Sequence, residues 1–377
     1  MKSIHAKYGL TRVINARGTF TPLGVSRSST RVRAAVADAL AEHFVIDELQ
    51  AAVSARIASH YGAETAAVVH CTAAAITVAV AAAMAGDAPE RVAALPDSTD
   101  MPNRVVIPAG HVVDYGHPIL TAIRLAGATP VIAGTEARCD IADLERALVE
   151  ERTACLLLVS SRLARGAPLD LGAAVAAAHR QSVPAIIDGA AQDLRLPELL
   201  ATRADLVLLS AQKYLAAPTA GLIVGRKPLV QACRAQERGI GRGMKASKEA
   251  LVGVLAALEE REALDLPAWQ AEQSRKVAWF VDQVRGVSGI AASSLPDSSG
   301  LPFSRVRLQI GPTTHPLASA AALAVALRQG APSIWVMDHA AADGYLLLEL
   351  VSLRDDEMGE IISSLSSLSV PKFADRR

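Results

Sequence analysis

Two polar side chains lie at the ends of two apolar runs in this 377-residue chain. Asp188 closes the run over residues 184–188, and Lys213 comes three residues after the run over residues 205–210. Runs of branched aliphatic residues like these predict buried β-strands, and parallel strands present reactive groups at their carboxyl ends. A carboxylate that can pair with a pyridinium nitrogen, together with an amine that can form an imine, is the minimal apparatus for pyridoxal phosphate chemistry.

Lys213 is the only lysine that directly follows a predicted buried strand. An imine-forming lysine must be neutral near pH 7, and partial desolvation lowers the pKa of an amine towards that range. A lysine that extends from a strand end to solvent is the alternative. Residues 210–213 also match the S-x-x-K motif of penicillin-recognising hydrolases, but the S-D-N and K-T-G motifs that accompany it are missing from the sequence. Asp188 has its own alternative role, as a cap of the following helix.

The turn from residue 68 to residue 75 is a candidate phosphate site. It leads from a predicted strand into a predicted helix, and small side chains follow Thr72. Free backbone N–H groups and the helix dipole attract anions at such a helix start, and the Thr72 hydroxyl could add a contact. A tight turn without a ligand is the alternative.

His111 follows the predicted strand over residues 104–107, so it should emerge at the same edge as Asp188. A histidine there could stack on a flat ring or transfer protons, although a purely structural polar residue is the alternative. Neither an H-x-x-x-H motif nor a carboxylate cluster in the sequence indicates a metal site.

The elements that must position these residues alternate between strands and helices, which predicts an α/β fold with a mostly parallel sheet flanked by helices. A long helix over residues 247–262 should leave this sheet for a smaller C-terminal α+β domain, in which residues 293–300 read as a loop. We therefore expect three parts. They are an N-terminal helical segment (1–60), a large cofactor-binding domain (61–245), and the connecting helix with the small domain (246–377).

Composition excludes several classes of function. Lysine plus arginine and aspartate plus glutamate both number 38, so the formal net charge of zero favours neither nucleic acid nor an anionic membrane as a partner. Four cysteines are scattered without metal-ligand or redox spacing, and the N-terminus has no apolar signal segment. We expect a cytoplasmic protein. The apolar stretch over residues 65–85 divides better into a strand and a buried helix than into a membrane span.

The chain resembles the fold-type-I pyridoxal phosphate enzymes, in particular the selenocysteine synthase-like and D-glucosaminate-6-phosphate ammonia-lyase-like group. The motifs that carry this resemblance are specific as a set. They are residues 8–19, 21–24, 47–50, 110–111, 187–192, 210–213 and 239–245. The resemblance implies a three-layer sandwich and pyridoxal 5'-phosphate as the cofactor. It also implies a homo-oligomer (a dimer, a dimer of dimers or larger) with active sites at the dimer interface.

The resemblance implies a role for each candidate residue. Lys213 would be the Schiff-base lysine, Asp188 would pair with the pyridinium nitrogen, and His111 would stack on the ring. The phosphate would be held by Cys71, Thr72, Ala73, Ala74 and Ser210, with Arg242 near the phosphate of its own or a neighbouring subunit. A solvated basic turn is the alternative reading for Arg242.

One departure from the group concerns recognition of the substrate's acidic group. The group tends to have an arginine in a C-terminal strand, within a stretch like Leu-Asp-x-Arg-Thr-Leu, where this chain has Val351. An arginine binds a carboxylate bidentately and valine cannot. The candidates for substrate contact are Arg17, Arg27, Tyr115 and His339, and two more arginines that could substitute are Arg305 and Arg307.

These observations predict an enzyme that removes the Cα proton of a small amino compound, with Lys213 as the general base. Because the shared motifs begin near residue 8 and the net charge is zero, we expect a small-molecule substrate rather than a charged tRNA. An α,β-eliminating ammonia-lyase is the favoured activity. A racemase or epimerase is the close alternative, since it needs only a second acid such as His111 or Tyr115. An aminotransferase and a cofactor-free scaffold of the same fold stay open.

Overall fold

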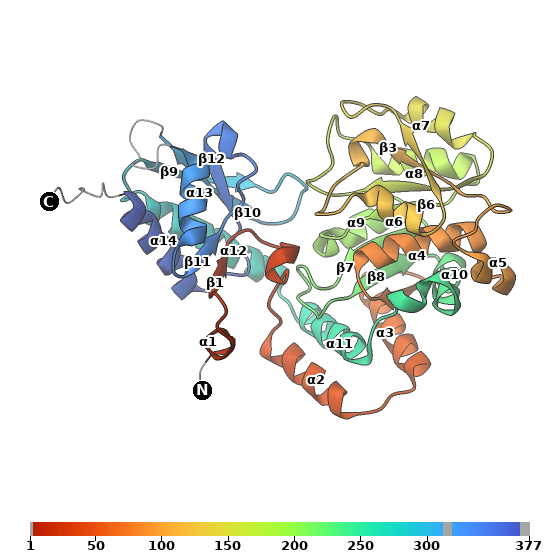
Figure 1. The fold of residues 1–377 in the computed structure, drawn as a ribbon, viewed down its shortest axis with the longest axis horizontal. Helices are drawn as coiled ribbons and strands as arrows, with labels where there is room; N and C mark the ends of the chain where they lie inside the picture. The colour runs from red at the N-terminus through yellow and green to blue at the C-terminus, as the bar shows by residue number, and fades with distance from the viewer. Residues whose placement is uncertain (1–2, 312–318, 370–377) are drawn as a thin grey trace. The chain divides into compact units, whose positions relative to one another are not determined.

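The computed structural model describes residues 3–311 and 319–369, and the chain divides into two compact units (Figure 1). The larger unit is Ser28–Ala263. The smaller unit joins Met1–Arg27 to Leu264–Arg377. Each unit has its own apolar core, and each is described separately below.

These units differ from the expected domains 1–60, 61–245 and 246–377. The N-terminal residues belong with the C-terminal part because strand β1 (Val13–Asn15) pairs in parallel with β11 (Ser333–Trp335). The two helices that follow the N-terminal residues belong instead to the large unit, where they pack against the long helix that the sequence assigned to the C-terminal part.

The large unit contains a seven-stranded sheet. Its strands are β2 (Thr65–Val69), β3 (Arg104–Pro108), β4 (Thr129–Ala133), β5 (Thr153–Val159), β6 (Ala185–Asp188), β7 (Leu206–Ser210) and β8 (Gly221–Gly225). Their order is β2-β8-β7-β6-β5-β3-β4. β8 is antiparallel to both neighbours, and all other neighbouring pairs are parallel. Six strands therefore run in one direction.

Helices surround this sheet. They are α2 (Thr30–Ala41), α3 (Ile46–Tyr61), α4 (Thr72–Ala85), α5 (Pro89–Ala94), α6 (Ile119–Leu125), α7 (Ile141–Leu148), α8 (Leu171–Arg180), α9 (Leu196–Ala201), α10 (Lys227–Ala235) and α11 (Lys248–Glu262). The short 3₁₀ turns are η2 (Ala109–His111), η3 (Asp193–Arg195), η4 (Gln236–Arg238) and η5 (Ile240–Met244). Local sequence fixes several of the helix starts. Asp140, for example, caps α7 by accepting a hydrogen bond from the Asp143 N–H at 3.0 Å.

Alternate strand residues point to opposite faces of the sheet, and each face has its own helices. Ile187 and Val207 pack with α3, α7, α8 and α11, whereas Ile186 and Leu208 pack with α4, α6 and α10. The expected α/β fold, with a mostly parallel sheet between helical layers, is confirmed. Helix α4 is buried almost all round, which explains the apolar stretch that includes it. Among the described residues, no helix combines the length and apolar character needed to cross a membrane.

The small unit carries two small sheets. A second set of strands, β9 (Ile290–Pro296), β10 (Ser304–Ile310) and β12 (Tyr345–Leu348), forms an antiparallel sheet of order β12-β10-β9 beside the β1–β11 pair. The helical segments are α1 (Ile4–Tyr8), η1 (Thr21–Leu23), α12 (Leu266–Val284), α13 (Ala320–Gln329), η6 (Ala341–Asp343) and α14 (Asp355–Ser369). The prediction of a loop over residues 293–300 is wrong for residues 293–296, because β9 continues to Pro296 through backbone pairing with β10.

Candidate active site at the carboxyl edge of the sheet

The carboxyl ends of the six codirectional strands lie on one edge of the large sheet, and the predicted residues gather there. Asp188 is the last residue of β6, and Ser210 is the last residue of the neighbouring β7. Beyond the strands the two segments stay bonded, because the Gly189 N–H donates to the Leu208 carbonyl at 2.9 Å and the Ser210 N–H to the Ala190 carbonyl at 3.0 Å. The fold therefore places the predicted acid beside the predicted lysine segment.

Asp188 is a buried carboxylic acid, with 6% of its surface exposed. Its Oδ1 accepts a hydrogen bond from the Ala190 N–H at 3.0 Å, which fixes the carboxylate at the strand end. Burial raises the pKa of Asp188, and the charge of Lys213 opposes this rise. A cation beside this acid therefore favours its ionised form.

Lys213 follows β7 in a tight turn, in which its N–H donates to the Ser210 carbonyl at 3.2 Å. Burial lowers the pKa of Lys213, while the charge of Asp188 raises it, that of Arg162 lowers it and that of Asp193 raises it. The desolvated amine is thus shifted towards the neutral form that a nucleophile or general base requires.

The turn after β2 presents backbone donors. Cys71 is the N-cap of α4 and makes no side-chain cap, so the first-turn N–H groups of residues 72–74 have no partner within the helix. The Thr72 hydroxyl donates to the Leu209 carbonyl at 3.2 Å, which ties this turn to β7. An anion here would meet these backbone N–H groups, and the contact expected from the Thr72 hydroxyl stays a prediction.

Gly221, a residue that the sequence reasoning missed, lets β8 start directly against this turn. A Cβ at position 221 would lie 2.4 Å from the Cys71 carbonyl oxygen and 2.9 Å from the Thr72 nitrogen, so any larger residue would displace the turn. A glycine at the start of a strand was the available signal, since such a glycine often marks a close backbone approach.

His111 lies in η2, directly after β3, and is buried. Its Nδ1 accepts a hydrogen bond from the Val159 N–H at 3.0 Å, so the ring reaches the end of β5, next to β6 in the sheet. Burial lowers the pKa of His111 to about 4. The imidazole is therefore neutral at pH 7 with its proton on Nε2, which suits a stacking or donating role better than that of a general base.

We expect the neutral state of His111 to show in the pH dependence of stability. An unfolded histidine takes up its proton near pH 6.5, whereas folded His111 does so near pH 4. This contribution is complete above pH 6.5, and about 3 kcal/mol of unfolding free energy is lost as the pH falls from 6.5 towards 4. Chemical denaturation across that range should show a smaller loss in His111→Asn. An identical pH dependence in both proteins would contradict a buried neutral imidazole.

Tyr115 also reaches this edge. Its hydroxyl is buried and has no hydrogen-bond partner among the described residues. Burial raises the pKa of Tyr115, and the charges of Asp188, Cys71 and Asp114 raise it further. This phenol therefore stays protonated at neutral pH.

Ser210 and Arg242 belong to two segments that hydrogen-bond to residues around Cys71. Ser210 is buried at the end of β7. Arg242 is exposed in η5, whose last residue, Met244, accepts a hydrogen bond from the His70 N–H at 2.7 Å. The segment that carries Arg242 therefore runs beside the residues that precede Cys71.

The remaining candidates lie in the small unit, and their arginines already hold partners. Arg17 pairs with Asp338 at 2.8 Å, and Arg27 binds both oxygens of Glu357 at 2.8 Å. His339 is exposed. Contact of these residues with a substrate stays a prediction.

The other arginines of this unit and the Val351 position show how its strands are tied together. Arg305 is buried and pairs with Glu349 at 2.8 Å, and Arg307 lies 4.2 Å from the centre of the Tyr345 ring. Val351 lies in the turn after β12, where the Lys276 Nζ donates to the Leu353 carbonyl at 2.8 Å. Val351 therefore lies beyond the C-terminal strand in which the resemblance led us to expect this position, and a backbone-binding lysine lies near it.

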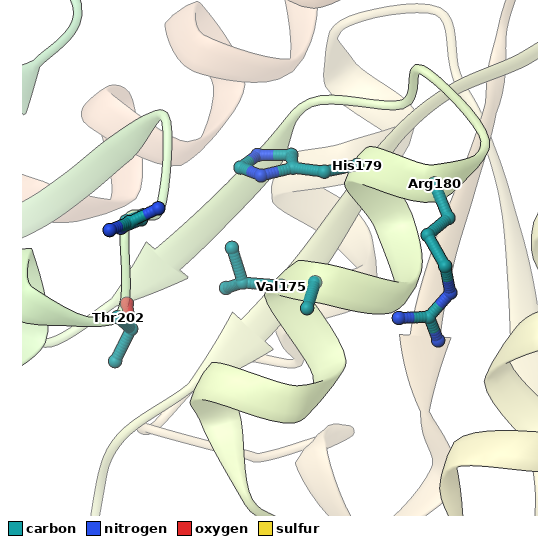
Figure 2. A pocket seen from close by; sticks show the side chains of 6 residues that line it. Val175, His179, Arg180 and Thr202 are labelled. Atoms are coloured by element: carbon teal, nitrogen blue, oxygen red, sulfur yellow. The ribbon is translucent and has the colours of Figure 1, made fainter.

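A hollow of about 390 Å³ lies elsewhere on the large unit (Figure 2). It is lined by Val175, Ala176, His179, Arg180, Thr202 and Arg203. His179 closes one side by a contact of 2.8 Å from its Nε2 to Asp205, directly before β7. The hollow therefore belongs to the amino edge of β7, opposite the edge that carries Ser210.

Comparison with known proteins gives full-length relatives, although no protein-family model matches the chain. A 5'-C-glycyluridine monooxygenase-decarboxylase from Streptomyces sp is 36% identical over 365 residues, which cover 96% of this chain and 90% of the relative. A D-glucosaminate-6-phosphate ammonia lyase from Salmonella typhimurium is 34% identical over 368 residues, which cover 97% of this chain and 98% of the relative. A solved structure of D-glucosaminate-6-phosphate ammonia-lyase superposes with a TM-score of 0.88 at 33% identity and covers 98% of both chains.

Proposed function

We propose that this chain, which belongs to the D-glucosaminate-6-phosphate ammonia-lyase group of fold-type-I pyridoxal phosphate enzymes, is itself a pyridoxal phosphate-dependent ammonia-lyase. The family resemblance expected from the sequence is thereby confirmed. The observation that carries the proposal is that Asp188 ends β6 while Lys213 lies in the turn directly after the adjacent parallel strand β7. The full-length similarity to an ammonia lyase, in sequence and in fold, supports the reaction type.

The residues at this edge fit pyridoxal phosphate. The first-turn N–H groups of α4 are donors for a phosphate. Gly221 has no Cβ that would displace the turn between β2 and α4. Tyr115 offers a buried hydroxyl that lacks a partner among the described residues. Asp188 is a buried acid whose ionised form is favoured by a neighbouring cation, and a protonated ring nitrogen would be such a cation.

We assign the binding roles accordingly. Lys213 would hold the cofactor covalently, Asp188 would pair with its ring nitrogen, and His111 would lie against the ring. The phosphate would contact the N–H groups of Cys71, Thr72, Ala73 and Ala74 and the side chains of Ser210 and Arg242. When bound, pyridoxal phosphate supplies an aldehyde that condenses with amines and a protonated ring that withdraws electrons from the substrate Cα.

The residues of the chain then have distinct tasks in the reaction. Lys213, shifted towards its neutral form by burial, removes the Cα proton as the general base. Asp188 would pair with the protonated ring nitrogen and so keep that nitrogen in position. The neutral His111 can donate a hydrogen bond only through Nε2, because its Nδ1 accepts one from the Val159 N–H. Loss of the Cα proton and of a hydroxide from Cβ leaves an enamine, and its hydrolysis gives a keto product and ammonia. The substrate class is therefore a small amino compound with a leaving group on Cβ.

The relative with 36% identity supports a second candidate, an oxygen-dependent decarboxylation. In that case the residues described above would hold the same cofactor. A racemase or epimerase is the third candidate. It would need neither oxygen nor a leaving group on the substrate, and the protonated Tyr115 would serve as its second acid. Oxygen demand and product analysis distinguish the three.

We expect ammonia and a keto acid to form at equal rates with and without oxygen. The test incubates the pyridoxal phosphate-loaded protein with amino acids, amino sugar acids and their phosphates, and measures ammonia, keto acid, carbon dioxide and oxygen uptake. Carbon dioxide released only in the presence of oxygen would favour the decarboxylase. Deuterium incorporation at Cα without ammonia would instead favour the racemase.

A further inference from the structure

We propose that Arg261 is a positioning residue that holds Lys213 opposite Asp188, an inference that rests on the function proposed above. Arg261 lies in the last turn of α11. Its Nη1 donates to Asp193 Oδ2 at 2.6 Å, and its Nη2 donates to the Tyr214 carbonyl at 2.7 Å. One planar guanidinium thus joins the segment after Asp188 to the segment after Lys213.

Each end of this bridge lies only a few residues along the chain from a reacting group. Asp193 is five residues beyond Asp188, at the start of η3 and directly after a turn closed by the Gln192 N–H, which donates to the Gly189 carbonyl at 2.7 Å. Tyr214 is adjacent to Lys213 in the chain. Because displacements of about 1 Å at a reacting group can cost roughly 10²-fold in rate, a bridge at this point can set the rate without touching the substrate.

The bridge is buried and cannot be replaced by a point charge. Asp193 is 2% exposed, the Arg261 side chain is 13% exposed, and the second carboxylate oxygen of Asp193 is buried without a partner among the described residues. A guanidinium presents two donors in a fixed plane, whereas a lysine ammonium presents one flexible group. Lysine at position 261 should keep the charge and lose one of the two contacts.

Arg261 also balances a charge that acts on Lys213. The groups that act on the Lys213 amine are Asp188, Arg162 and Asp193, and Asp193 is the one that Arg261 neutralises. Loss of Arg261 leaves the Asp193 carboxylate uncompensated, which should raise the pKa of Lys213. The effect of Arg261 on the position of Lys213 and its effect on the pKa of Lys213 can therefore be separated with two variants, Arg261→Lys and Arg261→Gln.

The test compares Arg261→Gln and Arg261→Lys with Tyr61→Phe as the matched control. Tyr61 is buried, its hydroxyl has no partner among the described residues, and the charges of Asp193 and Arg261 both influence its pKa. Its hydroxyl can therefore be removed from the same neighbourhood without the loss of a described hydrogen bond. Two readouts apply. The first is the pH midpoint of Lys213 acylation in the cofactor-free full-length chain, measured by peptide mass spectrometry, and the second is kcat and KM for ammonia release.

We expect Arg261→Gln to move the acylation midpoint to higher pH and to lower kcat by about 10- to 100-fold. Arg261→Lys should restore the midpoint, keep KM within about threefold and leave kcat low. If Arg261→Gln does not fold, the double variant Asp193→Asn/Arg261→Gln, which buries no lone charge, should move the midpoint to lower pH and keep kcat low.

Folded variants with the wild-type midpoint and kcat would overturn the proposal, as would full recovery of kcat in Arg261→Lys. Failure of the proposed function looks different. In that case the wild-type chain binds no pyridoxal phosphate and releases no ammonia, while the acylation midpoints still report on Arg261.

Discussion

Replacement of Lys213 by alanine is expected to lower ammonia release by roughly 10³-fold or more, because the variant lacks both the amine that holds the cofactor and the base that removes the Cα proton. The effect should fall on kcat, and the variant should stay folded, since the backbone hydrogen bond from the residue 213 N–H to Ser210 does not need the side chain. Steady-state kinetics of ammonia release, with denaturation curves of both proteins, give the measurement.

Lys227→Ala is the matched control for this experiment. Lys227 is exposed at the first position of α10, and its hydrogen bond to Glu64 comes from its backbone N–H. The rate of ammonia release by Lys227→Ala should equal that of the wild type. Substantial ammonia release by Lys213→Ala would remove the lysine from the proposed mechanism.

The second large effect is expected in Asp188→Asn. The amide oxygen can still accept from the Ala190 N–H, but the negative charge beside the cofactor nitrogen is lost. Removal of one partner from a buried charge pair costs about 3–5 kcal/mol, which corresponds to a loss of roughly 10²- to 10⁴-fold in kcat. Cofactor affinity and kcat, measured by absorbance and by ammonia release, test this expectation.

Asp205→Asn provides the control for a buried acid that lies outside the site. Asp205 directly precedes β7, is 5% exposed and accepts a hydrogen bond from the Ala185 N–H at 2.8 Å. Its replacement should lower the thermal stability and leave kcat unchanged. Equal losses of kcat in the two variants would mean that Asp188 acts through stability rather than through the cofactor.

The sequence predicted the sheet edge well because the strands there are almost purely aliphatic. In β6 and β7 the polar residue that ends each run is also the end of the strand, so Asp188 and Ser210 are where the pattern places them. Helix α4 could be separated from β2 because polar residues interrupt the apolar stretch between them. Local signals of this kind need no knowledge of distant residues.

Features that depend on distant parts of the chain could not be predicted in this way. β1 and β11 are three residues each and pair across 320 positions, and such short strands carry no periodicity. β9 continues through exposed residues because backbone pairing with β10 holds it. Arg261 lies in a charged helix end that resembles a solvated face, and only the fold reveals its contacts with Asp193 and Tyr214.

The central claim, a cofactor held by the amine of Lys213, can be tested by borohydride reduction of the protein mixed with pyridoxal phosphate. After unbound coenzyme has been removed, we predict that the protein is yellow, that borohydride bleaches this colour, and that peptide mass spectrometry finds the pyridoxyl phosphate group on Lys213. A protein that stays colourless with the coenzyme, or a label that lies on another lysine, would contradict the account.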